Sequence, residues 1–231
     1  MRVSEAKGCK PSPTEGSVYF YAVTFIKFES SLINNMKIYL TSFAARAIDK
    51  IDFSGLETVA FVTTAADPYE NKSFIEEDRQ ALENKGLKLT DVDLKKFKSE
   101  TIKSFFQDFD ILFVCGGNSF YLLEKIKECG LDKELRSLLD DGLLYIGSSA
   151  GSIVCCPNIE YAAEADDPSK AKLLKDFSGF NLVDFSILPH YGREKYAAMF
   201  EKIIHDFSHL DFQLIKDDEI ILVEDNHYTK L

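Results

Sequence analysis

The sequence predicts an α/β fold in which a mostly parallel sheet is covered by helices on both faces. Two patterns predict it. From Met36 onward, short apolar or β-branched runs alternate with helix-like segments, and this alternation is typical of βαβ units. In addition, the run 111–115 is continuously apolar, as a central strand buried on both faces should be.

The elements follow one another at short intervals. Strands are expected at 36–42, 58–64, 86–92, 110–115, 143–146 and 182–188, and helices at 67–85, 97–106, 120–126, 131–140 and 196–207. Two further short strands, 212–216 and 219–223, meet at Asp217-Asp218 and predict a hairpin or two adjacent strands. Because parallel strands end at one edge of a sheet, the ligand crevice is expected at their carboxyl ends.

Length and composition fit one domain. The expected domain covers residues 36–231, and residues 1–35 form an N-terminal extension that differs from the rest. The apolar run 18–26 within it is too short to span a membrane and is a poor signal peptide. A formal net charge of −11 argues against nucleic acid or an anionic membrane as a partner.

Cysteine and histidine usage predicts no metal site and no cofactor. The five cysteines form no C-x-x-C pair, and the four histidines show no ligand spacing such as H-E-x-x-H. A disulfide framework is not expected either, and a reducing cytoplasm is the predicted location.

The pentapeptide Gly147-Ser148-Ser149-Ala150-Gly151 has the pattern of a nucleophile elbow, G-x-S-x-G. It follows the apolar run 143–146 and precedes the run 153–156, which predicts a strand, a sharp turn and a short helix. The two glycines suit the close approach of strand and helix backbones. Since the pattern also occurs by chance, the interpretation needs a base, an acid and oxyanion donors.

A serine hydroxyl becomes a good nucleophile when a base takes its proton. His190 is the best candidate because it follows a predicted strand and should face the crevice. The other histidines are expected on or after the last helix, or near the C-terminus. For the acid we expect Asp225, which follows the last strand, with Asp167 on the loop after Ser149 as second choice.

The loop Gly116-Gly117-Asn118-Ser119 follows a predicted central strand. One oxyanion donor should be the N–H of Ala150, the residue after the nucleophile, and a neighbouring loop should supply the second. Gly117 suits this role because glycine lets its N–H approach a substrate closely. Asn118 is a candidate for substrate binding, although Asn118 or Ser119 can also cap the following helix.

Three sequence blocks follow one another along the chain: C-G-G-N-S-F-Y-L-L at 115–123, Y-I-G-S-S-A-G-S at 145–152 and P-H-Y at 189–191. Together they resemble the serine peptidase family that contains dipeptidase E (aspartyl dipeptidase) and cyanophycinase, over about residues 36–226. The resemblance implies a three-layer sandwich like that of class I glutamine amidotransferases, with serine in place of the usual cysteine at the elbow.

For function, the resemblance implies a serine exopeptidase or dipeptidase that forms an acyl-enzyme on Ser149. It implies a base at His190, oxyanion donors at Gly117 and Ala150, and a small peptide as substrate. Dipeptidase E prefers an N-terminal aspartate, and Arg193, just after the histidine block, is the candidate cation for it.

Two other functions remain open. A serine esterase of the α/β-hydrolase type shares the elbow, but it usually places its acid and histidine in a longer C-terminal portion. A non-catalytic amidotransferase-like domain would keep the crevice for binding, and the intact set of Ser149, His190 and Gly116-Gly117 argues against it. A homodimer is a further expectation.

Overall fold

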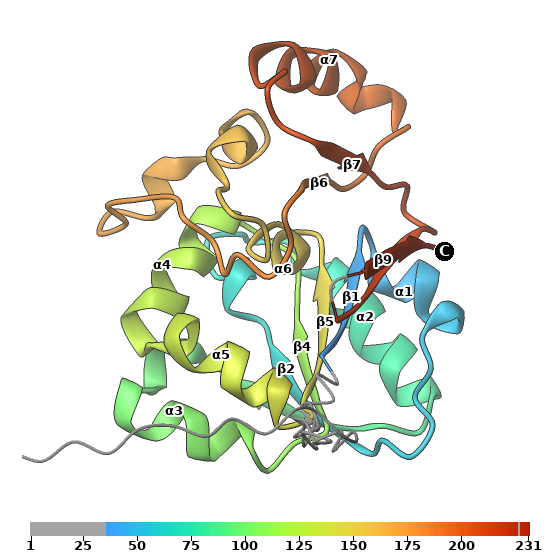
Figure 1. The fold of residues 1–231 in the computed structure, drawn as a ribbon, viewed down its shortest axis with the longest axis vertical. Coiled ribbons are helices and arrows are strands. Elements are labelled where there is room, and N and C mark those ends of the chain that lie inside the picture. Colours follow the sequence, from blue (N-terminus) through green and yellow to red (C-terminus); the bar gives the residue numbers. More distant parts are fainter. Residues whose placement is uncertain (1–35, 226) are drawn as a thin grey trace, which may run out of the picture. The chain divides into compact units, whose positions relative to one another are not determined.

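The computed structural model describes residues 36–225 and 227–231 (Figure 1). The expected N-terminal extension lies outside the described residues, so the division at residue 35 stays a prediction. A seven-stranded sheet with the order β3-β2-β4-β5-β1-β8-β9 forms the centre. Its strands are β1 (Lys37–Thr41), β2 (Thr58–Val62), β3 (Lys88–Val92), β4 (Ile111–Val114), β5 (Leu144–Ser148), β8 (Ile220–Glu224) and β9 (His227–Lys230).

The five strands β1 to β5 are parallel, and the last two strands reverse the direction. β8 runs antiparallel to β1, and β9 runs antiparallel to β8. The mostly parallel sheet of the predicted fold class is therefore confirmed. Because Thr41 pairs with Ile220, the amino end of β8 lies at the edge where the parallel strands have their carboxyl ends.

Helices cover both faces of the sheet, which gives the expected three layers (Figure 1). Alternate residues of β2 point to opposite faces: Val59 and Phe61 pack in one apolar cluster, and Ala60 and Val62 pack in the other. The first cluster includes α1 (Ala44–Ala47) and α2 (Ser73–Asn84), and the second includes α3 (Ser99–Phe106), α4 (Ser119–Cys129), α5 (Leu131–Asp140) and α6 (Ala150–Ile153).

A small second sheet lies over the carboxyl ends of the parallel strands (Figure 1). In it, β6 (Ser186–Leu188) pairs in parallel with β7 (Phe212–Leu214), and α7 (Ala197–Asp206) connects them. The two short C-terminal strands predicted as neighbours therefore lie in different sheets. The chain crosses from β7 to β8 at the crevice edge, and Asp217 lies in this crossing.

Short 3-10 turns complete the fold, at Ile48–Lys50, Thr64–Ala66, Leu94–Lys96, Glu160–Glu164, Pro168–Lys170 and Glu194–Tyr196. The helix expected from residue 67 begins later, at Ser73, whose N–H donates to the Asn71 side chain over 3.0 Å. None of the helices in the described ranges has the length and apolar character that crossing a bilayer requires.

Candidate active site

Ser149 occupies the sharp turn between β5 and α6, with φ 51° and ψ −106°. A positive φ is uncommon for a residue with a side chain and requires support from its surroundings. The support comes from main-chain hydrogen bonds: the Ser149 N–H donates to Thr41 O over 3.0 Å, and its carbonyl accepts from Ser152 N over 2.8 Å. The elbow predicted from the sequence is thus built between β1, β5 and α6.

The two glycines of the elbow are needed because backbones pass close to each other there. A Cβ atom on Gly147 would lie 2.6 Å from the main-chain carbon of Gly151. A Cβ atom on Gly151 would collide with the carbonyl of Val114. Any larger residue at either position would therefore push α6 away from β4 and β5.

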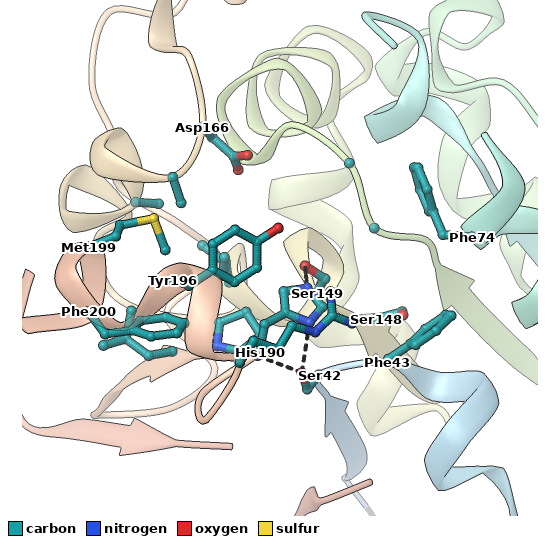
Figure 2. A pocket seen from close by; sticks show the side chains of 18 of the residues that line it. Ser42, Phe43, Phe74, Ser148, Ser149, Asp166, His190, Tyr196, Met199 and Phe200 are labelled. Carbon is teal, nitrogen blue, oxygen red and sulfur yellow. Dashed lines mark hydrogen bonds between the residues drawn. The ribbon is translucent and has the colours of Figure 1, made fainter. Parts of the chain in front are cut away.

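The structure brings Ser149 and His190 together at the carboxyl edge of the sheet. Ser149 Oγ lies 3.0 Å from His190 Nε2 (Figure 2). On the other side of the imidazole ring, His190 Nδ1 lies 2.7 Å from Asp217 Oδ1. A hydroxyl, an imidazole and a carboxylate in this order form the arrangement that activates serine nucleophiles.

Asp217 is held on both of its oxygens. Ser42, at the end of β1, donates its hydroxyl to Oδ1 over 3.0 Å, and the same hydroxyl accepts the His190 N–H over 2.6 Å. Arg193 donates to Oδ2 through Nε at 2.7 Å and Nη2 at 2.6 Å. The carboxylate is therefore fixed in position before any substrate binds.

This geometry corrects the expectation for the acid. Asp225 follows β8 and donates its N–H to Met36 O over 3.1 Å, so it lies at the amino end of β1, at the opposite edge of the sheet from Ser149. The expectation placed the carboxyl end of every strand at the crevice. This holds only for strands that run parallel to β1, and β8 runs antiparallel to it. Asp167, the second choice, accepts a hydrogen bond from Ser169 N over 2.9 Å, within its own loop.

The sequence reasoning also missed Ser42 and Asp217. Ser42 ended a predicted strand, so the strand-end argument that selected His190 could have included it. Asp217 could have been found only by knowing that the next strand runs antiparallel, which places the residues before that strand at the crevice.

The loop after β4 lies against Ser149. A Cβ atom on Gly116 would be 3.2 Å from the Cβ atom of Ser149, and Gly117 has φ 144°. Ala150 begins α6 on the other side of the nucleophile. Within the described ranges, neither the Gly117 N–H nor the Ala150 N–H donates a hydrogen bond to the protein, so both can bind a substrate oxygen.

Asn118 serves the architecture of this loop. Its side-chain oxygen accepts from Tyr121 N over 2.8 Å and caps α4, and its Nδ2 donates to Asp167 O over 3.1 Å. It is only 1% exposed and is not among the residues that line the pocket. The capping role is present, whereas the expected contact with substrate has no support.

The charges of the site suit a general base. Burial lowers the pKa of His190 below its usual 6.5, although the hydrogen bond to Asp217 opposes the shift. Burial opposes ionisation of Asp217, but hydrogen bonds from His190 and Arg193 outweigh it and lower the pKa of this carboxyl. At neutral pH the imidazole is therefore uncharged and able to accept a proton.

A pocket of about 440 Å³ opens over Ser149 and His190, a size suited to a small ligand. Phe43 and Phe74 lie on one side of the serine, and Tyr196 and neighbouring side chains of α7 lie on the other (Figure 2). Over the described residues, no three His, Cys, Asp or Glu side chains are grouped to hold a metal ion.

Comparisons with known proteins agree with this geometry. The model of Peptidase family S51 matches residues 35–231. An uncharacterized peptidase of Listeria innocua is 37% identical over 76% of this chain and 85% of its own length. Peptidase E of a Nostoc species is 32% identical over 64% of this chain and 58% of its own length. A crystal structure assigned to Peptidase E from Listeria monocytogenes EGD-e has a TM-score of 0.78 at 31% identity, covering 84% of this chain and 97% of that one.

Proposed function

This chain belongs to peptidase family S51, and on that premise we propose that it hydrolyses small peptides through an acyl-enzyme on Ser149. Membership makes it a serine peptidase of the dipeptidase E type, and therefore a hydrolase. The observation that carries the residue assignment is the continuous set of contacts from Ser149 Oγ through His190 to Asp217, at the base of the pocket.

In the proposed first step, Ser149 Oγ attacks the carbonyl carbon of the scissile peptide bond while its proton passes to His190 Nε2. Asp217 accepts the hydrogen bond from Nδ1–H and stabilises the imidazolium that forms. When the tetrahedral intermediate collapses, the C–N bond breaks and His190 gives the proton to the leaving amine. An ester between Ser149 and the acyl part remains.

In the second step, a water molecule replaces the leaving amine. His190 removes a proton from the water, the resulting hydroxide attacks the ester carbonyl, and the proton returns to Ser149 Oγ as the C–O bond breaks. The products are the free enzyme and a carboxylic acid, which releases its proton to solvent and becomes a carboxylate.

The negative charge that develops on the carbonyl oxygen needs donors in place beforehand. We assign this role to the N–H groups of Gly117 and Ala150, which flank Ser149 and are free to donate. One such donor contributes about 3 kcal/mol to transition-state stabilisation. Helix α6 has only 4 residues, so its dipole adds little to the stabilisation of this negative charge.

Catalysis is favoured over a purely binding role by the backbone of Ser149. A non-glycine residue with positive φ is costly to maintain, and here the strained residue holds its hydroxyl 3.0 Å from an imidazole. A binding domain has no need for this combination. Hydrolysis of an ester would use the same steps, but membership of a peptidase family favours peptides over esters as the substrates.

The test is a comparison of wild type with Ser149→Ala and, as matched control, Ser148→Ala, which removes the adjacent hydroxyl. We expect Ser149→Ala to lose dipeptide hydrolysis by at least about 10³-fold and to lose labelling by a fluorophosphonate probe, with a nearly unchanged melting temperature. Ser148→Ala should keep both properties. A Ser149→Ala protein that retains most of the wild-type turnover contradicts the assignment.

We also propose a cytoplasmic location. The four cysteines in the described part of the chain are buried, unpaired thiols, which supports a reducing compartment. The homodimer, and the expectation that neither nucleic acid nor membrane is a partner, stay predictions.

A further inference from the structure

Among the described residues that line the pocket, Arg193 is the only lysine or arginine. Two of its nitrogens already donate to Asp217 Oδ2, at 2.7 and 2.6 Å. A carboxylate on the substrate would have to compete with Asp217 for this guanidinium. Since Asp217 also holds His190, such competition would disturb the base. We therefore regard Arg193 as a positioning residue for Asp217 and not as a receptor for an acidic side chain.

The walls on both sides of the nucleophile are apolar. Phe43, directly before α1, and Phe74, on α2, stand on one side of Ser149 (Figure 2). On the other side, α7 and the turn before it contribute Tyr196, Met199, Phe200 and Ile203. Burying a leucine or phenylalanine side chain against such a wall contributes about 1.5–3 kcal/mol, whereas an aspartate side chain would lose hydration there.

Apart from the residues already assigned and three tyrosines, the ionisable side chains in the walls are two carboxylic acids, Asp78 and Asp166. Asp78, on α2, is 1% exposed and accepts a hydrogen bond from Ala45 N at 2.8 Å through Oδ1. Its buried Oδ2 has no hydrogen-bond partner among the described residues. Asp166 uses Oδ2 to accept from both the N–H and the hydroxyl of Ser119, at 2.8 and 2.6 Å.

Neither acid has a cationic partner in the described part of the protein. Burial is the main influence on both carboxyls, and it raises the pKa of Asp166 and brings that of Asp78 to about 7. A ligand that carries a positive charge would supply the missing partner, because opposite charges in a poorly solvated site attract strongly. A ligand with a carboxylate side chain would instead bring a third carboxyl group to the pocket and find no cationic partner for it among the lining residues other than Arg193, which is already bound to Asp217.

From these observations we infer that the site takes short peptides with an apolar N-terminal side chain and a free α-ammonium group, and that it disfavours peptides that begin with aspartate. The inference rests on the proposed function and names the substrate class of the same site. The apolar side chain packs against an aromatic wall, and the carboxyl groups that line the pocket without a cationic partner attract the ammonium group.

The first test measures binding without turnover. Ser149→Ala protein is titrated calorimetrically with Leu-Leu, Asp-Leu and N-acetyl-Leu-Leu. We expect Leu-Leu to bind at least about tenfold more tightly than either of the others, which corresponds to 1.4 kcal/mol or more. Equal or tighter binding of Asp-Leu, or no effect of acetylation, overturns the inference.

The second test compares hydrolysis by variants. Phe74→Ala should lower kcat/KM for Leu-Leu about tenfold, and Phe53→Ala, a partly buried phenylalanine of the same apolar cluster outside the pocket, should change it less than twofold. Equal losses in the two variants contradict a role for the aromatic wall. Arg193→Gln should lower kcat for Leu-Leu with little change in KM, as expected for a residue that acts through Asp217. A selective rise in KM for Asp-Leu would instead identify Arg193 as a substrate receptor.

The two proposals can fail separately. If Leu-Leu binds Ser149→Ala preferentially and the wild type hydrolyses no peptide, the proposed function is wrong and the ligand class is supported. If the wild type hydrolyses Asp-Leu faster than Leu-Leu, the proposed function is supported and the inference is overturned.

Discussion

Ser42 donates its hydroxyl to Asp217 Oδ1 over 3.0 Å, so the strand next to the elbow also positions the acid. The same hydroxyl accepts the N–H of His190, a residue with φ 65°. One buried side chain thus supports both the carboxylate and the strained backbone of the base.

Replacing Ser42 should therefore weaken catalysis without removing any reacting group. We expect Ser42→Ala to lower kcat by about 10- to 100-fold with a small change in KM. The His190 N–H then loses the hydroxyl that accepts its hydrogen bond, and the imidazole is no longer held in position for Ser149 Oγ. Steady-state kinetics on a cleaved dipeptide measure this. Ser148→Ala is the matched control, since its hydroxyl accepts from Ala44 N and contacts neither His190 nor Asp217. Identical kcat in the two variants would argue against a positioning role.

The identity of the acid is tested by Asp217→Asn and Asp225→Asn. An amide in place of the Asp217 carboxylate can no longer stabilise the imidazolium, and a loss of about 10⁴-fold in kcat is expected by analogy with other serine peptidases. Asp225→Asn changes an exposed residue at the far edge of the sheet and should leave kcat within twofold. The reverse ranking would return the assignment to Asp225.

The pH dependence of kcat/KM follows from the state of His190. The reaction needs the neutral imidazole, and the pKa of His190 lies below 6.5. The value of kcat/KM should therefore fall as the pH drops through this lowered pKa and reach its plateau above it. Because Asp217 raises the pKa of His190, Asp217→Asn should move the acid limb to still lower pH. An acid limb above pH 7 in the wild type would contradict this electrostatic description.

Asp78 should make the protein less stable as the pH rises. Its pKa is about 7 in the folded chain against an ordinary value of 3.8, so between about pH 4 and 7 the folded state keeps a proton that the unfolded state has lost. The free energy of unfolding then decreases with rising pH across this window. Asp78→Asn removes the effect and should stabilise the protein at pH 8 by roughly 2–4 kcal/mol, and by little at pH 4. Urea unfolding of the wild type and Asp78→Asn at both pH values measures this. Glu83→Gln, which changes an exposed acid of the same helix, is the control. Equal effects of Asp78→Asn at both pH values would contradict the assignment.

The fold, and the positions of Ser149 and His190 at one edge of the sheet, could be predicted because their signals are local. Apolar runs and glycine turns mark the parallel strands, and Ser149 and His190 both follow strands whose ends meet at one edge. The glycines at 147 and 151 are likewise a local requirement of close backbone approach.

The acid could not be predicted from local signals because it depends on strand direction. The runs 212–216 and 219–223 look alike in the sequence, yet β7 pairs with β6 in the small sheet and β8 pairs antiparallel with β1 in the main sheet. This choice depends on long-range packing, and it decides whether Asp217 or Asp225 lies beside His190. The role of Ser42 depends on the same choice, since its partner Asp217 reaches it only through the crossing between the two sheets.

The small sheet with α7 has a consequence for engineering the enzyme. The segment from β6 to Asp217 carries His190, Arg193 and one wall of the pocket, whereas the elbow and Ser42 belong to the main sheet. Exchanging only residues 196–210, between the base and the acid in sequence, would replace that wall while leaving every hydrogen bond among Ser42, Ser149, His190 and Asp217 to its original residues. New substrate preferences can thus be sought in a library confined to one surface helix.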